Sequence, residues 1–342
     1  MPKLRLLIIL SVLLCLAIGG IAKAECWRWM SNGIPAAMEY GLGSQTWMAF
    51  DEQKGEPAIL LWKYQGSSEL ELWHYDGRTW QQTWGGYVIP PRGNFIGPVG
   101  LYFDPNQNAL IMIDWILYDF EITSLMAYKY VDGQGWTYLD ETMESCYGGL
   151  PIYDSKRGRA VLVLSYCGAG YYFLEFDGYK FHYIEINREE FNFEEGVAGY
   201  NPETGRVICL CNNRGYGGYG TYEYDGNTWR LVEFPSGFPS VGSIISGLTF
   251  NPSLSGMLLL SAVMSDPQNP WEWDQKMWIY KNSDWINIPF EGRLCLLGEA
   301  AMCFDSQRNL AILFGGYLEL GGYSKLTWTL NQSWHCRPLG KP

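Results

Sequence analysis

Six copies of one short pattern run through the chain, and this repetition constrains the fold more than any other feature. An aromatic residue followed by Asp or Asn recurs every 47 to 54 residues, and a polar turn and an apolar run follow each copy. The pairs are Phe50-Asp51, Phe103-Asp104, Tyr153-Asp154, Tyr200-Asn201, Phe250-Asn251 and Phe304-Asp305. A period of this length indicates a repeat architecture with one supersecondary unit per repeat.

A second landmark alternates with the first and consists of an aromatic strand, a tight turn and another aromatic residue. Its copies end at Trp80, Trp136, Phe181, Trp229, Trp285 and Trp334. Asp-Gly, as in Asp76-Gly77, is a strong hairpin signal. The apolar runs do not alternate with polar residues, which predicts strands buried on both faces. Each repeat therefore contains four predicted strands, which we name a, b, c and d in chain order.

Four-stranded sheets packed face to face around an axis form a β-propeller. We predict an all-β protein with a six-bladed propeller of four-stranded antiparallel blades over residues 45–336. The predicted blades span approximately 45–88, 98–142, 148–188, 196–236, 246–290 and 299–336, between an N-terminal extension (25–44) and a tail (337–342). Because the repeats open on strand a and close on strand d, no blade is expected to be shared between the termini.

The pattern resembles that of bacterial secreted propellers of the kelch or galactose-oxidase type. Their repeat joins an aromatic-Asp strand, a run ending in Phe-Gly-Gly and a Trp-x-Tyr-Asp-Gly-x-x-Trp hairpin. The sixth repeat matches most fully, with Phe304-Asp305 and Phe314-Gly315-Gly316. The double glycine is missing from the other five repeats, so the resemblance implies a divergent member. Galactose oxidase holds copper with two His and two Tyr, and no matching set is visible here, so that activity is not implied.

The N-terminus predicts export. Lys3 and Arg5 precede an apolar stretch, and Ala22-Lys23-Ala24 matches a small-x-small cleavage site, which is typical of a secretory signal peptide over residues 1–24. The alternative is an uncleaved anchor. We expect cleavage after Ala24 and a secreted or periplasmic protein with no later membrane span. Cleavage removes three basic residues and no acidic ones, so the net charge falls from −12 to −15. Such an acidic protein is a poor partner for nucleic acid or anionic lipid.

Eight cysteines remain after cleavage, and an even number in an oxidising compartment favours disulfides. Cys26 and Cys336 flank the repeats, so a bridge between them is one candidate, and Cys295 with Cys303 is a second. Cys209 and Cys211 lie two apart on a predicted strand and are expected to pair elsewhere or stay free. They lack the spaced Cys or His partners of a zinc site. No metal or other cofactor is expected.

The b–c and d–a loops of a propeller share one face, which we call the variable face because these loops differ in length and composition. Function concentrates in such loops on a rigid scaffold. The candidate ligand-binding residues are Trp115, Tyr118, Asp119, Arg214, Tyr216, Tyr219, Trp271, Trp273 and Tyr317 in b–c loops, and Arg92 and Glu299 in d–a loops. Aromatic rings beside carboxylates suit sugars or protein surfaces. Alternatively, these rings only cover the blade ends.

Catalytic chemistry finds little support in the sequence. Only three histidines are present, His74, His182 and His335, and all are expected to be structural or simply exposed. This scarcity argues against a His-based metal centre or a Ser-His-Asp triad. We therefore expect a monomeric, non-enzymatic binding module for an unidentified protein or glycan. The alternatives are a carbohydrate-active enzyme with two carboxyls about 5–9 Å apart near the axis, and a purely structural surface protein.

Overall fold

The computed structural model describes residues 26–31, 47–63, 69–88, 94–118, 122–142, 146–147, 149–163, 166–167, 172–185, 196–213, 218–232, 244–266, 269–288, 296–318 and 327–331. Among these residues, no helix is long and apolar enough to cross a membrane.

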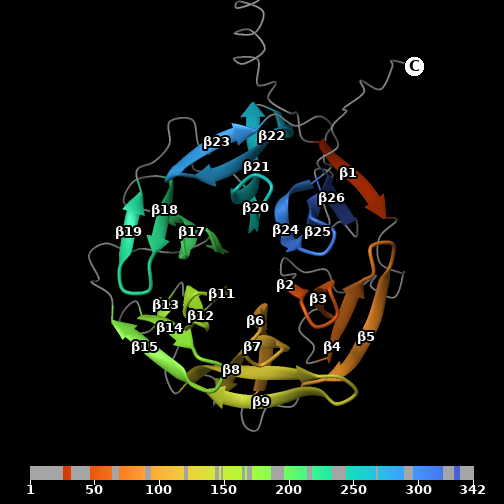
Figure 1. Cartoon of the computed structure of the whole chain (residues 1–342), viewed down its shortest axis with the longest axis vertical. Coiled ribbons are helices and arrows are strands. Elements are labelled where there is room, and N and C mark those ends of the chain that lie inside the picture. The colour runs from red at the N-terminus through yellow and green to blue at the C-terminus, as the bar shows by residue number, and fades with distance from the viewer. Residues whose placement is uncertain are drawn as a thin grey trace, which may run out of the picture.

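Six four-stranded antiparallel sheets stand around a central axis, as predicted (Figure 1). Blade 1 contains β2 (Trp47–Asp51), β3 (Glu56–Trp62), β4 (Glu69–Tyr75) and β5 (Trp80–Tyr87). Blade 2 contains β6 (Asn94–Asp104), β7 (Ala109–Tyr118), β8 (Ile122–Val131) and β9 (Gly135–Glu141). Blade 3 contains β11 (Leu150–Asp154), β12 (Arg159–Val163), β14 (Tyr172–Phe176) and β15 (Phe181–Glu185).

Blade 4 contains β16 (Gly196–Asn201), β17 (Arg206–Asn213), β18 (Gly218–Tyr224) and β19 (Trp229–Val232). Blade 5 contains β20 (Ile244–Asn251), β21 (Gly256–Asp266), β22 (Asn269–Lys281) and β23 (Asp284–Ile288). Blade 6 contains β24 (Leu296–Asp305), β25 (Leu310–Leu318), β26 (Thr327–Asn331) and β1 (Cys26–Ser31). A separate two-stranded sheet joins β10 (Cys146–Tyr147) to β13 (Tyr166–Cys167).

The hydrophobic core lies between neighbouring blades, and the continuously apolar b strands explain why. In β7, Leu110 and Met112 pack into the cluster shared with blade 1, whereas Ile111 and Ile113 pack into the cluster shared with blade 3. Successive side chains of a strand point to opposite faces of its sheet. A strand that is covered on both faces therefore needs apolar residues at every position, and this is the pattern of the b strands.

The sixth blade corrects the prediction that no blade is shared between the termini. The N-terminal strand β1 pairs antiparallel with β26 and forms the outermost strand of that blade (Figure 1). Trp27 lies opposite Leu330, as Trp80 lies opposite Tyr75 in blade 1. Trp27, and not Trp334, thus occupies the register position of the sixth landmark. The expected N-terminal extension contributes strand d of blade 6, and backbone hydrogen bonds between the two ends of the chain close the ring.

The aromatic-Asp landmark has a local cause at the a–b turns. In blade 1, Oδ1 of Asp51 accepts hydrogen bonds from the backbone N–H groups of Gln53 and Lys54, at 3.0 and 3.3 Å. Only a short side chain with an oxygen acceptor can bond the backbone two or three residues ahead in this way. The same role belongs to Asp104, Asp154, Asn201, Asn251 and Asp305 in the other blades.

A second device ties neighbouring blades together on the face formed by the a–b and c–d turns. The residue three positions after the capping Asp reaches the c–d turn of an adjacent blade in four of the six blades. The four contacts are Lys54 with Asp132 (3.0 Å), Gln107 with the carbonyl of Gly178 (2.7 Å), Arg157 with the carbonyl of Gly226 (3.5 Å) and Arg308 with the carbonyl of Asp76 (2.8 Å). The last of these links blade 6 to blade 1 and so also closes the ring.

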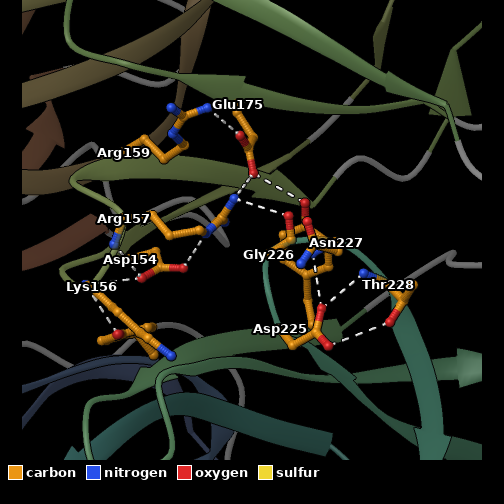
Figure 2. Close-up of polar contacts among 11 residues, drawn as sticks. Asp154, Lys156, Arg157, Arg159, Glu175, Asp225, Gly226, Asn227 and Thr228 are labelled. Atoms are coloured by element: carbon orange, nitrogen blue, oxygen red, sulfur yellow. Dashed lines mark hydrogen bonds and ion pairs between the residues drawn. The ribbon is translucent and has the colours of Figure 1, made fainter.

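The contact between blades 3 and 4 is the most elaborate of these (Figure 2). Arg157 donates to the Asp154 carboxylate at 2.7 Å, forms an ion pair with Glu175 and lies over the Tyr224 ring, 4.9 Å from its centre. Glu175 also accepts from Arg159 at 2.8 Å and from the Tyr224 hydroxyl at 3.1 Å. Both carboxylates are buried but fully partnered, so their charge is compensated within the protein.

Candidate functional site: the mouth of the central cavity

A cavity of about 1270 Å³ runs along the propeller axis. Its wall is formed mainly by the innermost strands β2, β6, β11, β16, β20 and β24, which are the a strands of the six blades. Small and apolar residues dominate this wall, for example Gly100, Ala198, Gly247 and Ala301. Within the described part of the chain, no group of three His, Cys, Asp or Glu residues is arranged to hold a metal ion.

Three tryptophans gather at one end of the cavity. Trp47 is the first residue of β2 and Trp62 is the last of β3, so both lie at the end opposite the a–b turn, which is the variable face. Their rings meet edge to face, with centroids 5.9 Å apart. Trp115 occupies in β7 the position that Trp62 occupies in β3, six residues after the strand begins. All three line the cavity.

Gly97 lets the Trp62 indole of blade 1 pack on blade 2. It is the strand partner of Trp115, and a Cβ atom at this position would lie 2.1 Å from Cζ2 of Trp62. Its φ angle of +152° is also one that residues with a side chain rarely adopt. Only glycine therefore lets the Trp62 ring pack directly on β6. Trp115, the strand partner of Gly97, packs on the other face of blade 2, in the cluster shared with blade 3.

A buried carboxyl group precedes Trp115 in β7 and is not part of the cavity wall. The Asp114 side chain is 0% exposed and lies on the same face of β7 as Met112 and Ile116, which belong to the apolar cluster between blades 1 and 2. Burial raises the pKa of Asp114 well above its ordinary value, and the nearby N–H groups of Trp115 and Gly97 offset this only in part. Among the described residues, neither carboxyl oxygen has a hydrogen-bond partner of acceptable geometry.

Burial without a charged partner therefore favours the protonated, neutral form of Asp114. The indole N–H of Trp62 is likewise buried and without a partner in the described part of the protein. Both groups lie where blades 1 and 2 meet at the variable face. A neutral acid and an indole N–H can each donate a hydrogen bond to a hydroxyl or carbonyl oxygen.

The structure places three of the predicted ligand-binding side chains. Trp115 and Tyr219 line the cavity, from blades 2 and 4, and Trp273 is partly buried on β22. For four others only a strand position is described; these are Tyr118, Trp271, Tyr317 and Glu299. The rest lie outside the described residues; these are Arg92, Asp119, Arg214 and Tyr216.

Several segments predicted as loops are in fact strand, and Tyr219, Glu299 and Tyr317 also lie in strands, namely β18, β24 and β25. Residues 114–118 complete β7, and β21 and β22 extend through Asp266 and from Asn269, so their hairpins project further than expected. Sequence reasoning also missed Trp47 and Trp62, and it took Asp114 for a loop residue. One sequence signal could have identified Trp62: it ends the apolar run of strand b, and a large ring at that position reaches the end of the blade.

The cysteines and histidines have structural surroundings. Cys209 and Cys211 are free, buried and part of the cavity wall, as the alternative of staying free predicted, and burial raises the pKa of Cys211. Cys303 is also free and buried, which gives no support to its pairing with Cys295. His74 is fully buried, with Nε2 2.9 Å from Oδ2 of Asp51, and it does not line the cavity.

Three predicted residues lie outside the described part of the chain: Cys295, His335 and Cys336. Cys26 begins β1, opposite Asn331, and the bridge from Cys26 to Cys336 stays a prediction.

Comparisons with known proteins address the fold. No family model and no curated protein matches the sequence. Among solved structures, the chain is similar to a protein of unknown function from Dyadobacter fermentans DSM 18053, with a TM-score of 0.56 and 14% identity over 90% of this chain and 97% of that one. It is also similar to Zg3597, a family 117 glycoside hydrolase of the marine bacterium Zobellia galactanivorans, with a TM-score of 0.46 and 11% identity over 75% of this chain and 90% of that one. At these identities the likeness shows the propeller fold alone.

Proposed function

We propose that the protein is an exported, monomeric, non-enzymatic binding module whose ligand docks over the cavity mouth on the variable face. The observation that carries this proposal is the packing of Trp47 against Trp62 at the cavity mouth, with Trp115 lining the same cavity from the next blade. Tryptophan is strongly enriched among residues that dominate binding energy. The kelch-type assignment of the blades belongs to the same proposal and rests on the repeat motif.

Of the two ligand classes expected from the sequence, the described residues favour a glycan. Indole rings offer flat apolar faces for the C–H faces of a sugar. The Trp62 indole N–H is a buried donor at this mouth, without a partner among the described residues. Sugar hydroxyl and ring oxygens are suitable acceptors. A protein ligand remains the other outcome of the test below.

The test is binding of the purified protein to glycan arrays and to arrays of cell-surface proteins. The Trp62→Ala/Trp115→Ala double variant is expected to lose affinity at least about tenfold, because a hot-spot aromatic contributes more than about 1 kcal/mol. Tyr179→Ala is the matched control, since Tyr179 is 70% exposed and lies on the c–d turn of blade 3, on the opposite face. Thermal unfolding of each variant checks that it is folded. Unchanged binding by a folded double variant would contradict the proposal.

Asp114 favours a second candidate, a carbohydrate-active enzyme. A buried carboxyl that stays protonated can serve as the general acid of a glycosidase, and a second carboxyl would then have to face it. No such pair lines the described part of the cavity wall, whose single carboxyl is Glu52 on the a–b turn. Hydrolysis of a glycoside by the wild type, abolished in Asp114→Asn, would replace the first proposal with this one.

A further inference from the structure

Two cysteines lie at directly opposite register positions in a small sheet that belongs to no blade. Strand β10 lies in the connection from blade 2 to blade 3, and β13 lies in the b–c connection of blade 3, so both are on the variable face. They pair antiparallel, with Cys146 opposite Cys167 and Tyr147 opposite Tyr166. β10 also lies against β8 of blade 2.

The register fixes the distance between the two backbones. Directly opposite residues of an antiparallel pair have Cα atoms about 4.5 or 5.5 Å apart, depending on whether they form the hydrogen-bonded pair. Disulfides span Cα separations of about 4.4–6.8 Å. Directly opposite residues also project from the same side of the sheet. A shift by one residue in either direction would leave one cysteine opposite a tyrosine and the other opposite Ser145 or Gly168, so the observed register is the one that favours a bridge.

We propose that Cys146 and Cys167 form a disulfide. The thiolate of one cysteine attacks the disulfide of an oxidant, either oxidised glutathione or an oxidised dithiol enzyme, and forms a mixed disulfide. The second thiolate then displaces the oxidant's sulfur. One sulfur–sulfur bond forms in the protein and one breaks in the oxidant, which leaves as two thiols carrying the two electrons and two protons. This proposal does not rest on the proposed function.

The bridge would close a loop of about 20 residues that contains β11 and β12, the a and b strands of blade 3. A cross-link over such a loop restricts the unfolded chain and so stabilises the folded one. It would also tie the link between blades 2 and 3 to the b–c hairpin of blade 3. Trp115 packs into the cluster between these same two blades. The disulfide would therefore hold the rim of the cavity mouth next to that indole.

Peptide mapping of the full chain tests the proposal directly. The protein is refolded in a mixture of reduced and oxidised glutathione, unfolded without reductant, alkylated and digested. A peptide joined through Cys146 and Cys167 is expected, which separates into its halves on reduction. Cys209, Cys211 and Cys303 are internal controls, since they are free thiols and are expected to be alkylated. Alkylation of Cys146 and Cys167 before reduction, or a link from either to another cysteine, would overturn the proposal.

A second measurement separates a bridge from mere packing. The midpoint of thermal unfolding of the wild type is expected to fall by roughly 5 °C on reduction. The midpoints of the single variants Cys146→Ser and Cys167→Ser should each lie about as far below the wild-type midpoint as that of the double variant, because either change removes the same bond. Reductant should not shift the double variant further. A reductant effect that persists in the double variant at full size would contradict the assignment.

Discussion

Replacing Asp114 with Asn should flatten the dependence of stability on pH, and the direction follows from the burial of this residue. Burial raises the pKa of Asp114 in the folded protein well above the ordinary value near 4, so the folded state holds this proton more tightly than the unfolded chain does. The unfolded chain releases that proton above pH 4. Stability is therefore greatest below the unfolded pKa, falls as the pH rises above it, and stops falling once the folded pKa is passed.

The magnitude comes from the linkage of one proton. Within the window between the two pKa values, each pH unit lowers the folding equilibrium constant by up to about tenfold. Asn has nearly the shape of Asp and does not titrate, so within this window the difference in unfolding free energy between wild type and variant should shift in favour of the variant by up to about 1.4 kcal/mol per pH unit.

Urea unfolding of both proteins at one-unit steps from pH 4 to pH 9 measures this difference. Asp76→Asn is the matched control, because backbone N–H groups of Thr79 and Arg78 lower the pKa of Asp76. Its contribution has the opposite sign and is lost as the pH falls through the folded pKa. Parallel curves for the wild type and Asp114→Asn would refute the reasoning, since they would mean that Asp114 is ionised in the folded state.

Two further predictions concern the contacts between blades. Arg157→Met should lower the free energy of unfolding in urea by about 2 kcal/mol, which is less than the usual cost of breaking a buried ion pair, because Glu175 keeps Arg159 and the Tyr224 hydroxyl as partners. The control variant Arg206→Met leaves Glu223 paired with Arg230 inside blade 4 and should cost less. An equal cost for the two variants would contradict the role of Arg157 between blades. A chain starting at residue 32 lacks β1 and should lose cooperative thermal unfolding, whereas a chain starting at Glu25 contains β1 and should unfold cooperatively. Equal midpoints of thermal unfolding for the two chains would contradict closure of the ring by β1.

The number of blades was predictable because each landmark has a local cause. An Asp or Asn must end strand a to cap the following turn, and apolar runs must form strand b because neighbouring blades cover both of its faces. Such requirements recur in every repeat. They are therefore visible without any knowledge of which segments meet in space.

The closing strand was not predictable in this way. β1 pairs with β26 from the other end of the chain, so no hairpin turn announces the pairing. In the sequence, Trp334 follows a short polar segment that resembles the expected c–d turn. The start of the sixth d strand was therefore assigned to Trp334 and not to Trp27. The only local signal for β1 was the alternating Trp27-Arg28-Trp29.

The cavity mouth was predicted in part. Trp115 was found because it lies in an unusual run, but Trp62 becomes part of the site only through its contact with Gly97 of the next blade. Contacts between blades depend on the relative placement of separate sheets, which the repeat pattern does not specify. The buried state of Asp114 was hidden for the same reason, because its segment was taken for a loop and not for the end of β7.

The most direct test of the proposed site is a crystal structure of the protein with the ligand that the arrays identify. The ligand is expected over the cavity mouth on the variable face, in contact with Trp62 and Trp115. A ligand held on the face of the a–b and c–d turns, or against the outermost strands, would contradict the site that the three tryptophans define.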